Sequence, residues 1–300
     1  MALAQAAEVK EALEKGHPGL ACELVILKVS GDDFTAWKKE EKVPVKGLFV
    51  KEIEGALLER RIEMAVHSVK DLQAELPAGL KIGAVLVRKD PRDALVTRDR
   101  KKLADLPTGA RVGVSSLRRQ SQLKRMRRDL EINPIRGNVD TRLKKLEAGE
   151  YDALVLAACG LVRLGLEGRI TEILSPEKMV PAPGQGALGV QIREDNQEVT
   201  ELLRAVNDPD SQLEVEAERA LMKALGGGCS VPVGALARIE RGSLTLSGIV
   251  LSPDGMKAVR KQVNGPKQSA QRLGTELASH LRAAGADRLL YGHWTEKVIR

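Results

Sequence analysis

The sequence is short of three features on which particular classes of protein depend. Only six of its 300 residues are aromatic, too few for the base-stacking surfaces that bind single-stranded nucleic acids. The three cysteines have spacings that fit neither a disulfide framework nor a zinc site, so we expect reduced thiols and no bound metal. No apolar run approaches the roughly 20 residues that cross a bilayer, and the N-terminus lacks the basic-then-apolar order of a secretory signal. We therefore expect a cytoplasmic protein that does not bind membranes.

Positive charge, in contrast, is in excess. Lysine and arginine number 48 against 41 aspartate and glutamate residues, a formal net charge of +7, which indicates an anionic partner. Nucleic acid and acidic small molecules both meet that condition, but the scarcity of aromatic residues favours a small acidic molecule. With 43% hydrophobic and 30% charged residues and no low-complexity tract, the chain should form two or three globular domains.

Helical and strand-like patterns alternate along the first half of the chain. Such alternation is typical of α/β layers with largely parallel sheets, whose ligands bind at strand C-termini and helix N-termini. The predicted strands are 20–29, 62–66, 80–87, 111–114, 131–135 and 152–157, and the predicted helices are 3–14, 49–60, 116–127 and 138–148.

Two stretches interrupt this alternation and are candidate crossings between domains. Residues 88–93 bring charge and proline, and residues 175–189 bring three prolines and three glycines. Farther on, short alternating segments and a closing helix near 267–284 predict a third, small α+β domain with an antiparallel sheet. We therefore predict domain 1 from residues 1–87 and 187–205, domain 2 from 92–180 and domain 3 from 209–300.

Residues 184–189 have the GxGxxG spelling of a dinucleotide-binding loop. That fingerprint needs a strand before it and a helix after it, whereas this segment follows Pro181 and Pro183 and leads into a strand-like run. We interpret it as a tight crossover loop with exposed backbone amides.

Residues 118–128 hold six basic residues and no acid, directly after a predicted strand. A solvated basic helix is the ordinary explanation of such a run. However, Ser115 and Ser116 fit the N-cap of a helix, which would bring free amides, hydroxyls and two guanidinium groups together. We therefore expect Arg118 and Arg119 to face a carboxylate or phosphate ligand.

Residues 135–143 repeat this pattern of strand, glycine turn and helix, with Arg136 and Arg142 on either side of the turn. Either arginine alone would be explained more simply as structural. Together with Arg118 and Arg119, at successive strand ends of one sheet, they predict a cleft for several carboxylates.

A different combination follows the predicted strand 62–66. Ser68 and Lys70 could bind an anion, whereas Asp71 is an acid in otherwise basic surroundings. A carboxylate kept there could stabilise a developing cation or move a proton.

The three cysteines fall in two kinds of surroundings. Cys22 and Cys159 lie in apolar segments, which predicts buried thiols without chemistry. Cys229 follows three glycines and precedes Val-Pro-Val-Gly, so its thiol should be reachable and could be an attachment point, although composition alone favours a structural loop.

Six segments together resemble the porphobilinogen deaminase family, also called hydroxymethylbilane synthases. The resemblance covers nearly the whole chain, and its most specific parts are residues 135–146 and 226–237. The six segments are HSVKDL at 67–72, DPRDAL at 90–95, GVSSLRRQSQL at 113–123, IRGNVDTRLKKL at 135–146, PAPGQGALG at 181–189 and GGGCSVPVGALA at 226–237.

The resemblance implies an enzyme of tetrapyrrole biosynthesis that joins four porphobilinogen molecules head to tail, releases ammonia at each step and frees hydroxymethylbilane by hydrolysis. It implies a monomer of three α/β domains, the first two like the lobes of a type II periplasmic binding protein. By similarity, Cys229 carries a dipyrromethane cofactor through a thioether and Asp71 is the catalytic aspartate. The residues expected to bind cofactor or substrate are Lys46, Ser68, Lys70, Ser115, Ser116, Arg118, Arg119, Arg136, Arg142, Arg163 and Gln185.

The chemistry of this reaction agrees with these residue types. Porphobilinogen carries an acetate and a propionate, so the growing chain accumulates about a dozen carboxylates, which an arginine-lined cleft suits. Loss of ammonia leaves a cationic electrophile, which the carboxylate of Asp71 would stabilise.

Two other classes of function remain open from the sequence. A two-lobed anion-binding module would share the fold without needing a thiol in a third domain, and a duplex-DNA binder would show salt-dependent binding at physiological ionic strength. Members of the family also begin with a strand that ends in Arg-x-Ser-Pro, whereas Met1 aligns inside the helix that follows. We therefore expect the natural chain to extend upstream.

Overall fold

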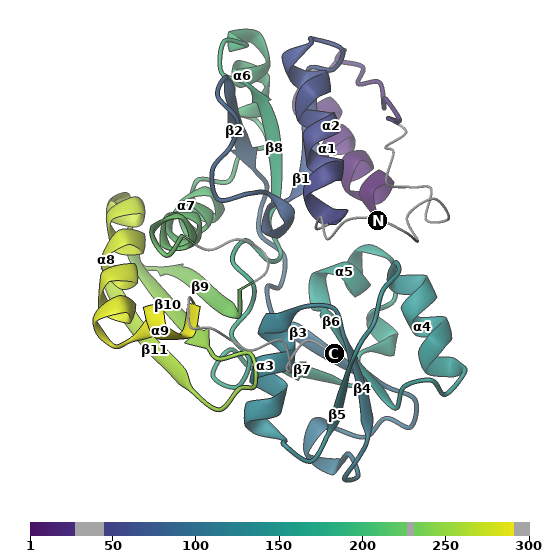
Figure 1. Ribbon diagram of the computed structural model, residues 1–300. Helices are drawn as coiled ribbons and strands as arrows, with labels where there is room; N and C mark the ends of the chain where they lie inside the picture. The colour runs from purple at the N-terminus through teal and green to yellow at the C-terminus, as the bar shows by residue number, and fades with distance from the viewer. Residues whose placement is uncertain (28–44, 227–230, 291–300) are drawn as a thin grey trace. The chain divides into compact units, whose positions relative to one another are not determined.

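Figure 1 shows the computed structural model, which describes residues 1–27, 45–226 and 231–290, without the side chains of 45–49. Contacts between residues divide the chain into two compact units. The N-terminal unit consists of residues 2–87 and 187–212, and the larger unit consists of residues 88–186 and the chain from 213 onward. The division into three domains stays a prediction.

The N-terminal unit is built on a three-stranded sheet whose middle strand comes from the second of its two chain segments. Strand β8 (Leu188–Arg193) lies between β1 (Met64–Ser68) and β2 (Leu80–Val85) and runs antiparallel to both. The helices of this unit are α1 (Ala2–Gly16), α2 (Val45–Leu58) and α6 (Gln197–Leu203). Val9 of α1 and Val190 of β8 are buried in one core, so the helix covers a face of the sheet.

The predicted strand 20–29 is wrong for the residues that the structure describes. Residues 21–27 form no strand, and Leu24, Val25 and Ile26 are 42%, 54% and 71% exposed. An apolar run predicts a strand locally, but a strand also needs a neighbour that completes its hydrogen bonds. None of the described strands pairs with this segment.

The larger unit begins with a five-stranded sheet. Its strands, in spatial order, are β5 (Glu131–Pro134), β4 (Arg111–Val114), β6 (Ala153–Ala157), β3 (Asp93–Thr97) and β7 (Glu172–Leu174), and its helices are α3 (Leu117–Met126), α4 (Val139–Glu147) and α5 (Ala158–Arg163). β4 runs parallel to β5 and β6, whereas β3 runs antiparallel to β6 and β7. The prediction of largely parallel sheets is therefore wrong, because β3 and β8 each follow a crossing between units and enter their sheets in the opposite direction.

Helices α3 and α4 begin where the sequence predicts, at side chains that cap them. The Ser116 hydroxyl accepts a hydrogen bond from the Arg119 amide at 3.3 Å, and the Asn138 side-chain oxygen accepts one from the Thr141 amide at 2.8 Å. Because α3 follows β4 and α4 follows β5, and these strands are parallel neighbours, both helix starts lie at one edge of the sheet.

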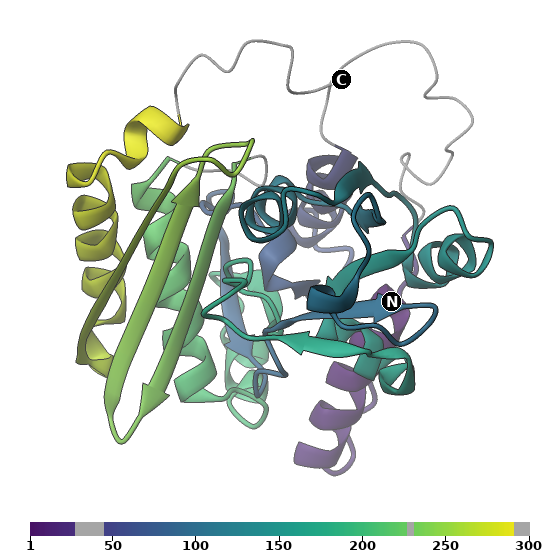
Figure 2. The same cartoon turned by 90° about the horizontal axis from the view of Figure 1, so that it is seen from below.

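The rest of the larger unit is an antiparallel sheet that helices cover on one face. Its strands lie in the order β11 (Ala258–Pro266), β10 (Ser243–Leu251), β9 (Val233–Glu240), with helices α7 (Pro209–Ala224), α8 (Ala270–Ala283) and α9 (Ala286–Leu290) before and after them. The side chains of Leu221 in α7 and Leu277 in α8 both pack over Gly248 of β10. Figure 2 shows α8 lying along the sheet. The predicted antiparallel sheet with a closing helix is confirmed, and the fold class is α/β as predicted.

The GxGxxG segment leads into strand β8 and not into a helix, which confirms that it is no dinucleotide fingerprint. Gly184 and Gly186 have φ of 72° and 92°, the left-handed region in which glycine is favoured, as a tight crossover loop requires. Single 3₁₀ turns lie at Val69–Asp71, Leu103–Asp105, Glu167–Arg169 and Lys267–Ser269. Among the described helices, none is long and apolar enough to cross a membrane.

Candidate active site

Arg118 and Arg119 lie in the first turn of α3 and are only 4% and 5% exposed. Nη1 of Arg118 donates to Oδ2 of Asp93 at 2.7 Å and to the Val180 carbonyl at 2.7 Å. Nε and Nη2 of Arg119 donate to Oδ1 of Asp93 at 2.9 Å and 2.7 Å. Their contact with a ligand stays a prediction, but a buried carboxylate that the sequence analysis missed already uses much of their hydrogen-bonding capacity.

Asp93 is the first residue of β3 and is completely buried. Burial by itself would raise the pKa of its carboxyl, but the charges of Arg118 and Arg119 hold that pKa well below its usual range. The one signal in the sequence is an acid at the head of the apolar run Asp-Ala-Leu-Val, where a strand begins. A charged residue there has to find a partner elsewhere in the fold.

Gln185 of the crossover loop completes this network. Its Nε2 donates to Oδ1 of Asp93 at 3.0 Å and to the Pro91 carbonyl at 2.6 Å, and its Oε1 accepts from Nη2 of Arg119 at 3.5 Å. The predicted residues Arg118, Arg119 and Gln185 are therefore brought together around one carboxylate.

Arg142 of α4 adds further positive charge and has no carboxylate partner in the part of the chain described. Its Nη1 donates to the Ser115 hydroxyl at 3.0 Å and its Nε to the Gly137 carbonyl at 2.8 Å. Burial and the neighbouring charge of Arg119 lower the pKa of this guanidinium. We call Arg118, Arg119 and Arg142 the arginine cluster. Asp93 pairs with the first two of its three guanidinium groups, which leaves positive charge for an anionic ligand.

The other predicted residues of the larger unit lie around this cluster in different roles. Ser116 caps α3, as the sequence predicted. Arg136 is exposed between β5 and α4. Arg163, at the end of α5, donates to the Gly186 carbonyl at 3.2 Å and so supports the crossover loop.

Ser68, Lys70 and Asp71 belong to the N-terminal unit, where β1 ends and a 3₁₀ turn begins. The Ser68 hydroxyl accepts a hydrogen bond from Nε2 of Gln5 at 2.7 Å, which ties the turn to α1. All three predicted residues are half-buried. A carboxylate and an ammonium group that follow one another at such a turn can bind a polar ligand and stabilise charge on it.

Two predicted residues cannot be placed in this way. Cys229 and the side chain of Lys46 lie outside the described residues. The prediction of a buried thiol is confirmed for Cys159, whereas Cys22 is only half-buried. Both are free cysteines.

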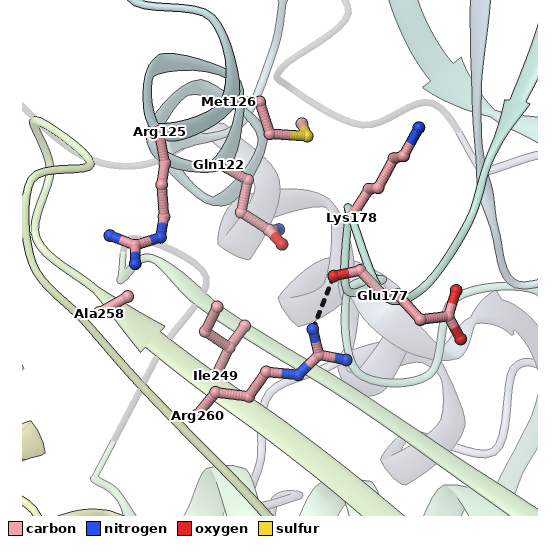
Figure 3. A pocket seen from close by; sticks show the side chains of 8 residues that line it. All are labelled: Gln122, Arg125, Met126, Glu177, Lys178, Ile249, Ala258 and Arg260. Carbon is pink, nitrogen blue, oxygen red and sulfur yellow. Dashed lines mark hydrogen bonds between the residues drawn. The ribbon is translucent and has the colours of Figure 1, made fainter.

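A separate cavity of about 430 Å³ lies between α3 and the antiparallel sheet (Figure 3). Arg125, Lys178 and Arg260 give its lining positive charge, and Nη1 of Arg260 donates to the Glu177 carbonyl at 2.7 Å. None of the predicted site residues lines this cavity. It is therefore distinct from the arginine cluster.

Models of known protein families match most of the chain. One described as "Porphobilinogen deaminase, dipyromethane cofactor binding domain" matches residues 1–201, and one described as "Porphobilinogen deaminase, C-terminal domain" matches residues 212–283. A curated protein of Syntrophobacter fumaroxidans named porphobilinogen deaminase is 49% identical over 290 residues, 97% of this chain and 94% of that protein.

Solved structures show a more distant likeness. The periplasmic VFT2 domain of Bordetella pertussis BvgS is 16% identical over 72% of this chain and 82% of that chain, with a TM-score of 0.40. An arginine-specific periplasmic binding protein of Salmonella typhimurium is 14% identical over 69% of this chain and 84% of that chain, with a TM-score of 0.37.

Proposed function

Because the chain belongs to the porphobilinogen deaminase family, it polymerises porphobilinogen into hydroxymethylbilane with a dipyrromethane cofactor, and we propose which of its residues do so. The observation that carries this assignment is the excess of guanidinium charge around Asp93. Porphobilinogen and the chains made from it are polycarboxylates, so they need that charge.

The residues of the arginine cluster fit the cofactor. Besides the unmatched charge of Arg142, Nε of Arg118 is buried and has no hydrogen-bond partner among the described residues. Ligand carboxylates accept strong hydrogen bonds from such groups. We assign the carboxylates of the dipyrromethane to Ser115, Arg118, Arg119, Arg136 and Arg142. When bound, this cofactor supplies the ring carbon to which the first porphobilinogen is joined.

Cys229 is the proposed point of attachment, through a thioether. In the sequence it lies between α7 and β9, two elements of the larger unit, which also contains the arginine cluster. The other thiols suit this role less: Cys159 is 4% exposed, and Cys22 belongs to the N-terminal unit.

Asp71 is the proposed catalytic residue. As ammonia leaves porphobilinogen, positive charge develops on the substrate ring, and an ionised carboxylate beside the ring N–H lowers the free energy of that state. Asp71 is half-buried at a turn, whereas the carboxylate of Asp93 is completely buried among arginines. This contrast supports Asp71 as the acid that meets the substrate.

The remaining assignments are coarser. The other residues proposed to bind substrate or cofactor are Lys46, Ser68, Lys70, Ser116, Arg163 and Gln185. A monomeric state and a cytoplasmic location also belong to the proposal.

Mass spectrometry of the intact protein tests the attachment. The wild type should carry the added mass of a dipyrromethane, and Cys229→Ser should lose both this mass and activity while its far-ultraviolet circular dichroism shows that the fold is intact. Cys22→Ser and Cys159→Ala serve as controls that keep the adduct. A Cys229→Ser protein that retains the added mass would contradict the assignment, and a wild type without an adduct would favour an anion-binding module without catalysis.

A further inference from the structure

Glu218, which the proposed function does not use, is completely buried on α7 and accepts four hydrogen bonds. Nη1 and Nη2 of Arg88 donate to its two carboxylate oxygens at 2.8 Å and 3.0 Å. The Gly184 amide donates to Oε2 at 2.5 Å, and the Ala237 amide donates to Oε1 at 2.7 Å. The Glu218 side chain therefore forms hydrogen bonds with three segments of the chain: residues 88–93, the crossover loop at 184–189 and strand β9.

A path of hydrogen bonds, with one covalent step from the main chain to the side chain of Gln185, leads from Glu218 to the arginine cluster. Nε of Arg88 donates to the Gln185 carbonyl at 3.0 Å, and the Gln185 side chain in turn contacts Asp93 and Arg119. The side chain of Arg88 is 5% exposed and Gln185 is 1% exposed, so the path runs through the interior of the larger unit. Hydrogen bonds in such surroundings are strong and polarise one another.

The ion pair between Arg88 and Glu218 is better suited to orienting the residues around it than to stabilising the fold. A buried ion pair adds little net stability, because the loss of hydration offsets the attraction between the charges. It does fix geometry, since the planar guanidinium of Arg88 binds both oxygens of Glu218 in one arrangement. A shift of the Glu218 carboxylate would move Gly184 and Gln185, and with them the groups that hold Arg119.

We propose that Glu218 is a positioning residue, which through Arg88 and Gln185 sets the position of the Arg119 guanidinium for the carboxylates of the substrate. The inference rests on the proposed function of the arginine cluster. It assigns to the part of the chain that carries Cys229 a role in shaping the anion site, in addition to attachment of the cofactor.

Steady-state turnover of porphobilinogen by the holoenzyme tests this, with KM and kcat determined separately. Glu218→Gln replaces one carboxylate oxygen by an NH₂ group, and because each oxygen accepts two hydrogen bonds, two of the four donors lose their acceptor. Arg88→Lys is milder, because it keeps the ion pair and loses only the fork and the bond from Nε to Gln185. Both variants should raise KM about 2- to 30-fold, the range found for mutations along such networks, with a smaller change in kcat.

A double-mutant cycle separates positioning from general destabilisation. In a Gln185→Ala background the effect of Arg88→Lys on KM should disappear, since the path is already broken there. Leu246→Ala, in the core of the antiparallel sheet, serves as a control that lowers stability and leaves KM unchanged. An unchanged KM for Arg88→Lys, or an equal effect in both backgrounds, would overturn the inference. If Gln185→Ala itself leaves KM unchanged, the assignment of Gln185 to substrate or cofactor binding is wrong. The inference about Glu218 is then wrong as well, because it acts through Gln185.

Discussion

Asp93 and Asp71 differ in how deeply they are buried. Asp93 is enclosed by Arg118, Arg119 and Gln185. Asp71 lies half-buried in the 3₁₀ turn that follows β1. The first therefore organises the arginine cluster, whereas the second is the one that we assign to the substrate.

Asp93→Asn should lower the free energy of unfolding at pH 7 by about 3–5 kcal/mol, because two buried guanidinium groups lose their counter-charge. The pKa of Asp93 is lowered in the folded protein, so its contribution is present above the unfolded-state pKa near 3.9 and is lost as the pH falls through the folded-state pKa. The difference in stability between wild type and variant should hence be constant from pH 7 to about pH 5 and shrink below about pH 4.

Urea unfolding at a series of pH values from about 3 to 7 measures this difference. Asp99→Asn, at an exposed ion pair with Lys101, is a control that should change stability little at any pH. A stability difference for Asp93→Asn that does not narrow in acid would contradict the assigned charge state.

Asp71→Asn should permit attachment of the cofactor but lower kcat by about 100-fold or more, since the amide keeps the shape and loses the charge that stabilises the developing cation. Intact mass and turnover are measured on the same sample. Asp105→Asn, at an exposed acid of the larger unit, should retain normal turnover. Near-normal turnover of Asp71→Asn would rule out the electrostatic role.

At the scale of elements, the turn between β10 and β11 lies very close to helix α3. The Ser121 hydroxyl donates to the Pro253 carbonyl at 3.1 Å. A Cβ atom at Gly255, whose φ is 74°, would lie 2.3 Å from the Ser121 carbonyl oxygen. The turn therefore fits against the helix that bears Arg118 and Arg119 only if residue 255 has no side chain.

Gly255→Ala should lower the free energy of unfolding by about 2–5 kcal/mol, because backbone strain and a clash with α3 add together. Gly242→Ala is a matched control: its φ is 81°, but nothing lies within 4 Å of the added methyl group. It should lose only about 1–2 kcal/mol. Equal losses in the two variants would show that the approach to α3 is looser than described.

Some helices and strands could be predicted from the sequence and others could not. The starts of α3 and α4 were predicted correctly, because Ser116 and Asn138 cap their helices through neighbours three residues away. The strand at 20–29 was predicted wrongly and Asp93 was missed as a partner of the arginines, because both depend on residues distant in the sequence. The prediction of largely parallel sheets was wrong for the same reason, because the directions of β3 and β8 depend on where the chain crosses between the units.

For the molecule as a whole, the excess of positive charge bears on substrate binding. The formal net charge of +7 attracts polycarboxylates from a distance, while Arg118 and Arg119 are shielded from salt by burial. Exposed Arg136 is the kind of group that salt screens.

Raising NaCl from about 0.05 M to 0.5 M should therefore increase KM for porphobilinogen several-fold and change kcat less, because the screening length falls from above 10 Å toward 3 Å. Turnover assays at constant pH measure both constants, with thermal unfolding as a check that the fold is intact. A KM independent of salt would mean that the buried arginines alone determine affinity.

The position of β8 in the middle of its sheet has a consequence for synthesis on the ribosome. β1 and β2 leave the ribosome before β8, the strand that lies between them in the sheet. About a hundred residues separate β2 from β8 in the chain. At translation rates of about 5–20 residues per second, the two strands wait about 5–20 s for their partner. The five-stranded sheet encoded in between has all its strands before β8 is made. During that interval, the unpaired strands of the nascent N-terminal unit are the surface that a chaperone would meet first.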